Sequence, residues 1–167
     1  MKKKLYILLS LFMLGMSILL LASQWKFLPQ MLPAHIGLNG TTSGSMAKWV
    51  LWVMPILQIL ISVLLFVPIT KNTMRFINVP YKSKILQLPD VEFNNIKPLI
   101  SEMLISIALW VNFLFYYILK FFIAFVLKKT TPNLRLYIFI ILVLLIVLVF
   151  YSSYKIKKEI RVMENKQ

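Results

Sequence analysis

The chain has 167 residues, of which 60% are apolar and 14% charged, and its mean hydropathy is +0.82. Soluble domains are about 45 to 50% apolar and about 25% charged, so this composition excludes an ordinary soluble enzyme and indicates a membrane protein. The 19 Lys and Arg against 5 Asp and Glu give a net charge of +14. In a membrane chain this excess is typical of basic residues beside anionic headgroups, so no nucleic-acid partner is expected.

Four apolar stretches predict an all-α integral membrane protein with four transmembrane helices. The first, residues 5–23, follows three lysines. At about 1.5 Å per residue it is long enough for a hydrocarbon core of about 30 Å. It also exceeds the usual apolar length of a signal peptide, so we expect an uncleaved helix. The second stretch, residues 49–69, has no charge and begins with Trp49 and Trp52, which favour the membrane interface.

The third stretch, residues 99–127, is too long for one perpendicular span. It either tilts, or it ends near Lys120 with the aromatic segment 121–125 at the interface. Pro98 suits the first position of this helix. The fourth stretch, residues 136–154, ends in tyrosines and is the clearest span. No linker or repeat divides the sequence, so we expect a single domain over residues 1–167.

The distribution of basic residues predicts the orientation. Three precede the first span, five lie between the second and third, and five follow the fourth, which leaves six on the opposite side. Because Lys and Arg collect on the cytoplasmic side, both termini are predicted to be cytoplasmic and the loop at residues 24–48 extracellular. Lys128, Lys129 and Arg135 oppose this rule locally, and a re-entrant third segment is the alternative that would explain them.

The loop at residues 24–48 differs in chemistry from the apolar stretches around it. Pro29 and Pro33 fix φ and favour extended geometry before them, so the loop does not continue the first helix. Its apolar side chains suit packing onto helix ends. We expect a short structured cap, in which His35 and Lys48 could meet above the helices.

The spacing of Leu28-Pro29, Pro33, His35, Gly40 and Lys48, followed by an apolar span, resembles a motif of one family. The family comprises small bacterial membrane proteins grouped as domain of unknown function 1648, and the resemblance covers about residues 24–82. Where the family usually has Asn, Glu and Asp, this chain has Gly37, Thr41 and Ser43. The loss of the carboxylates argues against cation binding by the loop. The family includes the N-terminal module of the immunity protein against the sporulation-delaying toxin.

The resemblance implies an immunity or resistance protein of the bacterial cytoplasmic membrane. Such a protein would bind a membrane-active peptide at the loop through Pro33, His35, Gly40 and Lys48, with Lys48 meeting an anionic group. Two other functions remain open: an accessory subunit of a larger membrane complex such as an exporter, and a small proton-coupled carrier that uses Glu102. The expected partners are the bilayer, a hydrophobic or antimicrobial peptide, and another membrane protein or a second copy of the chain.

Each of these residues also has a simpler explanation. His35 has no second ligand near it, so a structural hydrogen bond is favoured and no metal or cofactor is expected. Lys48 suits headgroup phosphates. Glu102, three residues after Leu99, suits an interfacial carboxylate near a helix N-terminus.

Four polar residues lie inside the predicted second and third spans: Gln58, Ser62, Ser106 and Asn112. Such side chains form hydrogen bonds between helices at about 0.6 kcal/mol each, so a role in helix packing explains them without a catalytic or transport role. No cluster of His and carboxylates, nucleophile motif or phosphate-binding loop is found, so we do not expect an enzyme.

Overall fold

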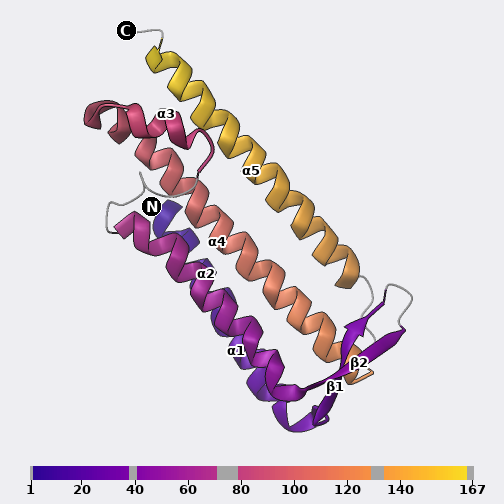
Figure 1. Cartoon of the computed structure of the whole chain (residues 1–167). Coiled ribbons are helices and arrows are strands. Elements are labelled where there is room, and N and C mark those ends of the chain that lie inside the picture. Colours follow the sequence, from indigo (N-terminus) through magenta and orange to yellow (C-terminus); the bar gives the residue numbers. More distant parts are fainter. Residues whose placement is uncertain (1, 38–40, 71–78, 129–133, 165–167) are drawn as a thin grey trace.

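The computed structural model of the chain describes residues 2–37, 41–70, 79–128 and 134–164 (Figure 1). Five α-helices, two strands and two short 3₁₀ segments make up this part. In chain order they are α1 (Lys2–Gln24), η1 (Trp25–Phe27), β1 (Met31–Ile36), β2 (Thr42–Ala47), η2 (Lys48–Trp52), α2 (Val53–Thr70), α3 (Lys82–Gln87), α4 (Asp90–Val126) and α5 (Leu134–Glu164).

Helix α4 is the centre of the bundle and packs against α1, α2 and α5. Figure 1 shows both chain termini at one end of the bundle, here called the termini end, and the two strands at the other, here called the hairpin end. In the described part of the chain, four helices are long and apolar enough to cross a membrane, within Lys3–Phe27, Lys48–Ile69, Asp90–Val126 and Arg135–Met163. The chain is therefore a mostly helical protein of the multi-pass membrane type.

The third long helix differs from the sequence prediction at its start. Helix α4 begins at Asp90, and Pro98 lies inside it. The prediction that Pro98 is the first helical residue is therefore wrong. Asp90 and Glu92 occupy the first turn, where carboxylates are favoured by the helix dipole, and Phe93 is buried one step later. The helix also continues past Lys120 to Val126 without a break.

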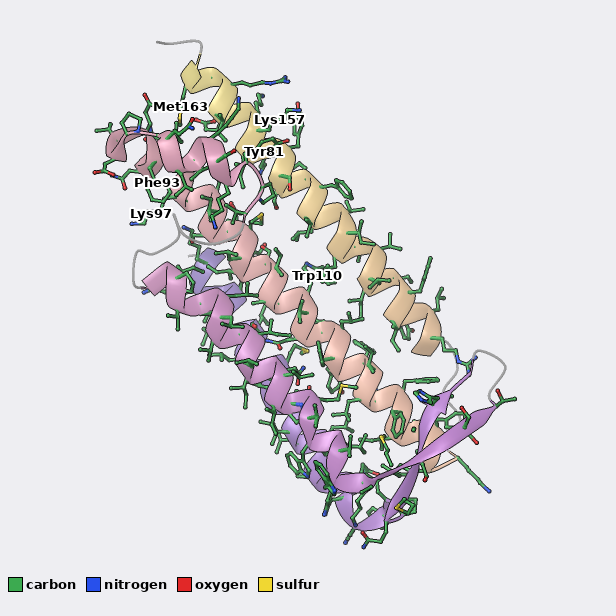
Figure 2. The ribbon with its side chains drawn as sticks, in the orientation of Figure 1. Tyr81, Phe93, Lys97, Trp110, Lys157 and Met163 are labelled. Carbon is green, nitrogen blue, oxygen red and sulfur yellow. The ribbon has the colours of Figure 1, made fainter. Side chains whose placement is uncertain are left out.

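Apolar packing at the termini end extends α4 and α5 beyond their most apolar stretches. Phe93, Ile96 and Ile100 of α4 face Ile156, Ile160 and Met163 of α5, and Ile85 of α3 joins the same core. In both helices the buried positions recur every three or four residues, as expected for one helical face. Figure 2 shows Phe93 and Met163 in this region, with Lys157 near Tyr81, whose ring centroid lies 6.0 Å from the Lys157 Nζ.

The segment between α1 and α2 corrects the all-α prediction, because it contains a two-stranded antiparallel sheet. Met31 pairs with Ala47, Pro33 with Ser45, and Ile36 with Thr42. Leu28 has the extended geometry expected before Pro29. Gly44 has φ +66, a conformation that residues with a Cβ adopt only with strain. Proline and glycine placement thus favours a hairpin over a continued helix.

The hairpin is anchored to the bundle by apolar packing. Leu32 of β1 is only 1% exposed. It belongs to a buried cluster with Leu21 of α1, Leu51 of η2, and Leu119 and Ile123 of α4. An isolated two-stranded hairpin is marginally stable in water, so this cluster is what fixes the sheet against the helix ends.

Candidate functional site

Lys48 lies where the hairpin joins α2. Its backbone N–H donates to the carbonyl of Gln30 at 2.9 Å, one step beyond the last strand pair. Its Nζ lies 4.8 Å from the centroid of the Trp25 ring, and the Trp25 and Trp52 rings are 5.8 Å apart. A cation over an indole face contributes about 0.5 to 1 kcal/mol at an exposed site. Lys48 therefore joins the hairpin to the ends of α1 and α2.

The motif residues do not gather at one point. Pro33 lies within β1, and His35 is exposed on the same strand opposite Ser43. His35 is five residues beyond Gln30, the backbone partner of Lys48, which corresponds to about 17 Å along a strand. The expectation that His35 and Lys48 meet is therefore wrong. Gly40 falls outside the described residues.

A cavity of about 720 Å³ lies between the hairpin and the end of α4. Its apolar lining comes from both parts of the chain. The hairpin segment contributes Pro29, Met31, Leu32 and Pro33, and α4 contributes Phe125 and Val126. Thr42, Gly44 and Ser45 of the second strand border it, together with Lys128. This size is within the range of ligand sites, about 300 to 1,000 Å³.

Lys128 gives this cavity a cation. It follows the last turn of α4 at φ 52, and its N–H donates to the Phe125 carbonyl at 3.0 Å. The side chain is exposed. Sequence analysis identified Pro33 but missed Phe125, Val126 and Lys128, since no local pattern indicates that residues nearly a hundred positions apart share a cavity. The only sequence signal was that the third apolar stretch continues past Lys120.

Basic side chains without nearby carboxylates characterise the hairpin end. The chain has no Asp or Glu in residues 1–89 or 103–158. Several of the cations lie over aromatic rings: Lys48 over Trp25, Lys120 about 6 Å from Tyr116 and Tyr117, and Arg135 5.3 Å from Phe121. The cavity thus combines apolar walls with nearby charged residues that are all basic.

Glu102 is remote from this cavity. It is exposed on α4, 24 residues before Val126, which corresponds to about 36 Å along a helix. It lines a separate cavity of about 190 Å³, together with Lys155 of α5 and Tyr6 of α1. Glu102 and the hairpin therefore form two different sites.

A buried polar cluster joins three helices in the middle of the bundle. The Nδ2 of Asn112 donates to the Ser10 Oγ at 2.7 Å and to the Ser62 Oγ at 3.0 Å. The Nε2 of Gln58 donates to the Asn112 carbonyl at 3.0 Å. The pairing of Gln58, Ser62 and Asn112 across helices confirms that prediction, whereas Ser10 was missed and Ser106 lines the Glu102 cavity instead.

No metal centre is found among the described residues of the site. Among the described residues, no group of three or more His, Cys, Asp or Glu side chains could hold a metal ion. His35 is exposed on the hairpin, and the described carboxylates lie on α4 and α5, far from it along the chain. The described residues of the hairpin end offer apolar contact and positive charge for recognition.

Comparison with known proteins identifies the segment that carries the hairpin. No curated protein and no solved structure matches the chain. Residues 11–59 match the model of the family described as Domain of unknown function (DUF1648). The matched segment runs from α1 through both strands to α2, and it includes all of the motif positions. Residues 11–59 of this chain are therefore similar to the DUF1648 family.

Proposed function

We propose that the protein confers immunity or resistance by binding a membrane-active peptide at its hairpin end, on the outer face of a bacterial cytoplasmic membrane. The observation that carries the proposal is the cavity of about 720 Å³ between the hairpin and the end of α4. The resemblance of the motif to an immunity protein module supports the biological role.

The cavity suits an amphiphilic segment. Met31, Phe125 and Val126 supply apolar walls that would cover hydrophobic side chains of a peptide, while Thr42 and Ser45 supply hydroxyl groups at the border. Apolar lining with a few polar groups is typical of binding sites, in which apolar contact gives affinity and the polar groups fix orientation.

The charge of the hairpin end favours an anionic group on the peptide. Lys128 lines the cavity and is exposed, so it is available to a carboxylate. No acidic residue of the described hairpin end competes for it. A carboxylate side chain or the free C-terminus of a peptide would bind there.

The first experiment compares cells that lack, contain or overproduce the protein in their sensitivity to a panel of membrane-active bacteriocins. We expect overproduction to raise the inhibitory concentration of at least one peptide and deletion to lower it. Unchanged sensitivity to the whole panel in both strains would refute the proposal.

Matched variants then locate the site. Lys128→Gln should weaken peptide binding about tenfold, since a contact with a charged group is worth about 1.4 kcal/mol or more. Lys26→Gln is the control, because Lys26 is exposed at the same end but does not line the cavity. Binding to the purified protein is measured by titration of the labelled peptide in nanodiscs. Equal losses in both variants would mean that only general positive charge matters and would contradict the cavity as the site.

A further inference from the structure

The cavity lined by Glu102 also has a side chain of opposite charge in its lining. Glu102 of α4 and Lys155 of α5 both line it. Tyr6, Ser106, Tyr151 and Ser152 add hydroxyl groups, and Leu99, Met103 and Leu148 complete the lining. Three helices therefore contribute to it, with α4 in the centre between α1 and α5.

The two charges do not neutralise each other directly. In the described part of the chain, no ion pair within 4.0 Å is found between the Glu102 carboxylate and the Lys155 ammonium. The Lys155 Nζ instead lies 4.6 Å from the centroid of the Tyr151 ring. Both charged side chains are exposed. A dipolar ligand with one charge of each sign would complement both groups at once.

The cavity lies where the apolar stretches of three helices begin or end. Tyr6 follows Lys4 by two residues, Leu99 follows Lys97 by two, and Lys155 comes directly after the apolar stretch at 136–154. Boundaries of this kind mark the level of lipid headgroups, where charged and aromatic side chains are favoured. The position thus favours a lipid headgroup over a ligand in the hydrocarbon core.

The volume limits the size of the ligand. About 190 Å³ corresponds to roughly six water molecules at about 30 Å³ each, which is below the range of drug-sized sites. A small phosphorylated amino alcohol fits this scale. The exposed apolar surfaces of α1 and α5, such as Leu5, Val147 and Phe150, are available to the acyl chains.

We propose that this cavity is a binding site for the headgroup of a zwitterionic phospholipid with a primary ammonium group, of the phosphatidylethanolamine type. The ammonium donates hydrogen bonds to the Glu102 carboxylate. The phosphate accepts from the Lys155 ammonium and from the serine and tyrosine hydroxyls. A choline headgroup has no N–H to donate to Glu102, so it binds more weakly. The site is independent of the peptide cavity and of the function proposed for it.

Native mass spectrometry of the full chain, released from nanodiscs of equal phosphatidylethanolamine and phosphatidylcholine with identical acyl chains, tests this assignment. We expect ethanolamine lipid to be retained preferentially. Glu102→Gln should reduce that preference about tenfold, whereas Lys155→Gln should weaken retention of both lipids about tenfold, because both carry the phosphate. Glu159→Gln and Lys158→Gln are the controls. These residues lie on α5 outside the cavity, and each substitution changes the net charge by the same amount as the matching cavity variant.

Three results would overturn the proposal. The first is equal retention of the two lipids by the unchanged protein, and the second is equal losses in the cavity variants and their controls. The third is displacement of the retained lipid by soluble glycerophosphoethanolamine at a comparable concentration, which would assign the cavity to a free zwitterion. Circular dichroism of each variant confirms that the helices remain folded, so a loss of lipid is not a loss of fold.

Discussion

Asn112 of α4 joins helices α1 and α2 through hydrogen bonds in the middle of the bundle. Its side chain on α4 donates to Ser10 of α1 and Ser62 of α2, and its carbonyl accepts from Gln58. Within the described residues, the Asn112 Oδ1 and the Gln58 Oε1 are buried without a hydrogen-bond partner. The cluster therefore fixes the arrangement of three helices, while its unpartnered oxygens reduce its net contribution to stability.

We predict that Asn112→Leu lowers the free energy of unfolding by about 1 kcal/mol. The side-chain hydrogen bonds to Ser10 and Ser62 are lost, at about 0.6 kcal/mol for each partner in membrane proteins, and loss of the unpartnered oxygen offsets part of this. Equilibrium unfolding in mixed micelles, followed by circular dichroism, measures the change. Asn94→Leu is the control, because Asn94 is exposed on the same helix. A stability equal to that of the unchanged protein would show that the cluster contributes nothing.

Among the secondary-structure elements, the hairpin requires a glycine at position 44, and its sequence pattern alone does not indicate this requirement. Gly44 has φ +66, and a Cβ built there would lie 3.1 Å from the Ala34 Cβ on the opposite strand. A side chain at this position would therefore cause backbone strain and also a close contact with Ala34. The sheet has only two strands, so it has few other interactions that could absorb the change.

We predict that Gly44→Ala destabilises the hairpin by about 1 to 2 kcal/mol, which is the cost of a left-handed conformation with a Cβ. Amide hydrogen exchange in residues 31–47, followed by mass spectrometry in detergent, should become about 5 to 30 times faster. Gly15→Ala is the control, since nothing lies within 4 Å of a Cβ at this helical position. Unchanged exchange in Gly44→Ala would contradict a structural requirement for glycine.

Local sequence patterns predicted the helices better than they predicted the hairpin. Long apolar stretches indicated four of the helices, because hydropathy alone reports a membrane span. Residues 90–98 and 155–164 were not recognised as helical, because their apolar positions are separated by charged ones and match no uniform stretch. The prolines predicted the extended segment around β1, yet strand pairing depends on Gly44 and on the packing of Leu32, which are tertiary effects.

The candidate site was predictable only where one segment supplies it. The motif singled out Pro33, which lines the cavity, and Lys48, which lies at the base of the hairpin. Phe125 and Lys128 reach the same cavity because α4 is continuous past Lys120 and ends beneath the sheet. That juxtaposition follows from helix length and packing, so no local sequence pattern indicated it.

At the scale of the whole molecule, charge is distributed unequally between the two ends. The five acidic residues all lie in residues 90–102 and 159–164, and the hairpin end carries basic residues alone. In the proposed orientation the positive-inside rule disfavours basic residues at the hairpin end, and contacts with aromatic rings offset this for some of them. Lys48 and Arg135, for example, lie over Trp25 and Phe121. Such contacts reduce the cost of placing these two cations on the outer side, which the proposed orientation requires.

We predict opposite accessibility for single cysteines at the two ends. The chain has no native Cys, so Ser43→Cys on β2 and Ser83→Cys on α3 each give one exposed thiol. A membrane-impermeant maleimide should label Ser43→Cys in intact cells and Ser83→Cys only after permeabilisation. The reason is the positive-inside rule: thirteen of the 19 basic residues lie before the first span, between the second and third, or after the fourth. The reverse pattern would place the hairpin in the cytoplasm, where it could not intercept an external peptide. Labelling of both in intact cells would mean that the two ends of the bundle do not lie on opposite sides of the membrane.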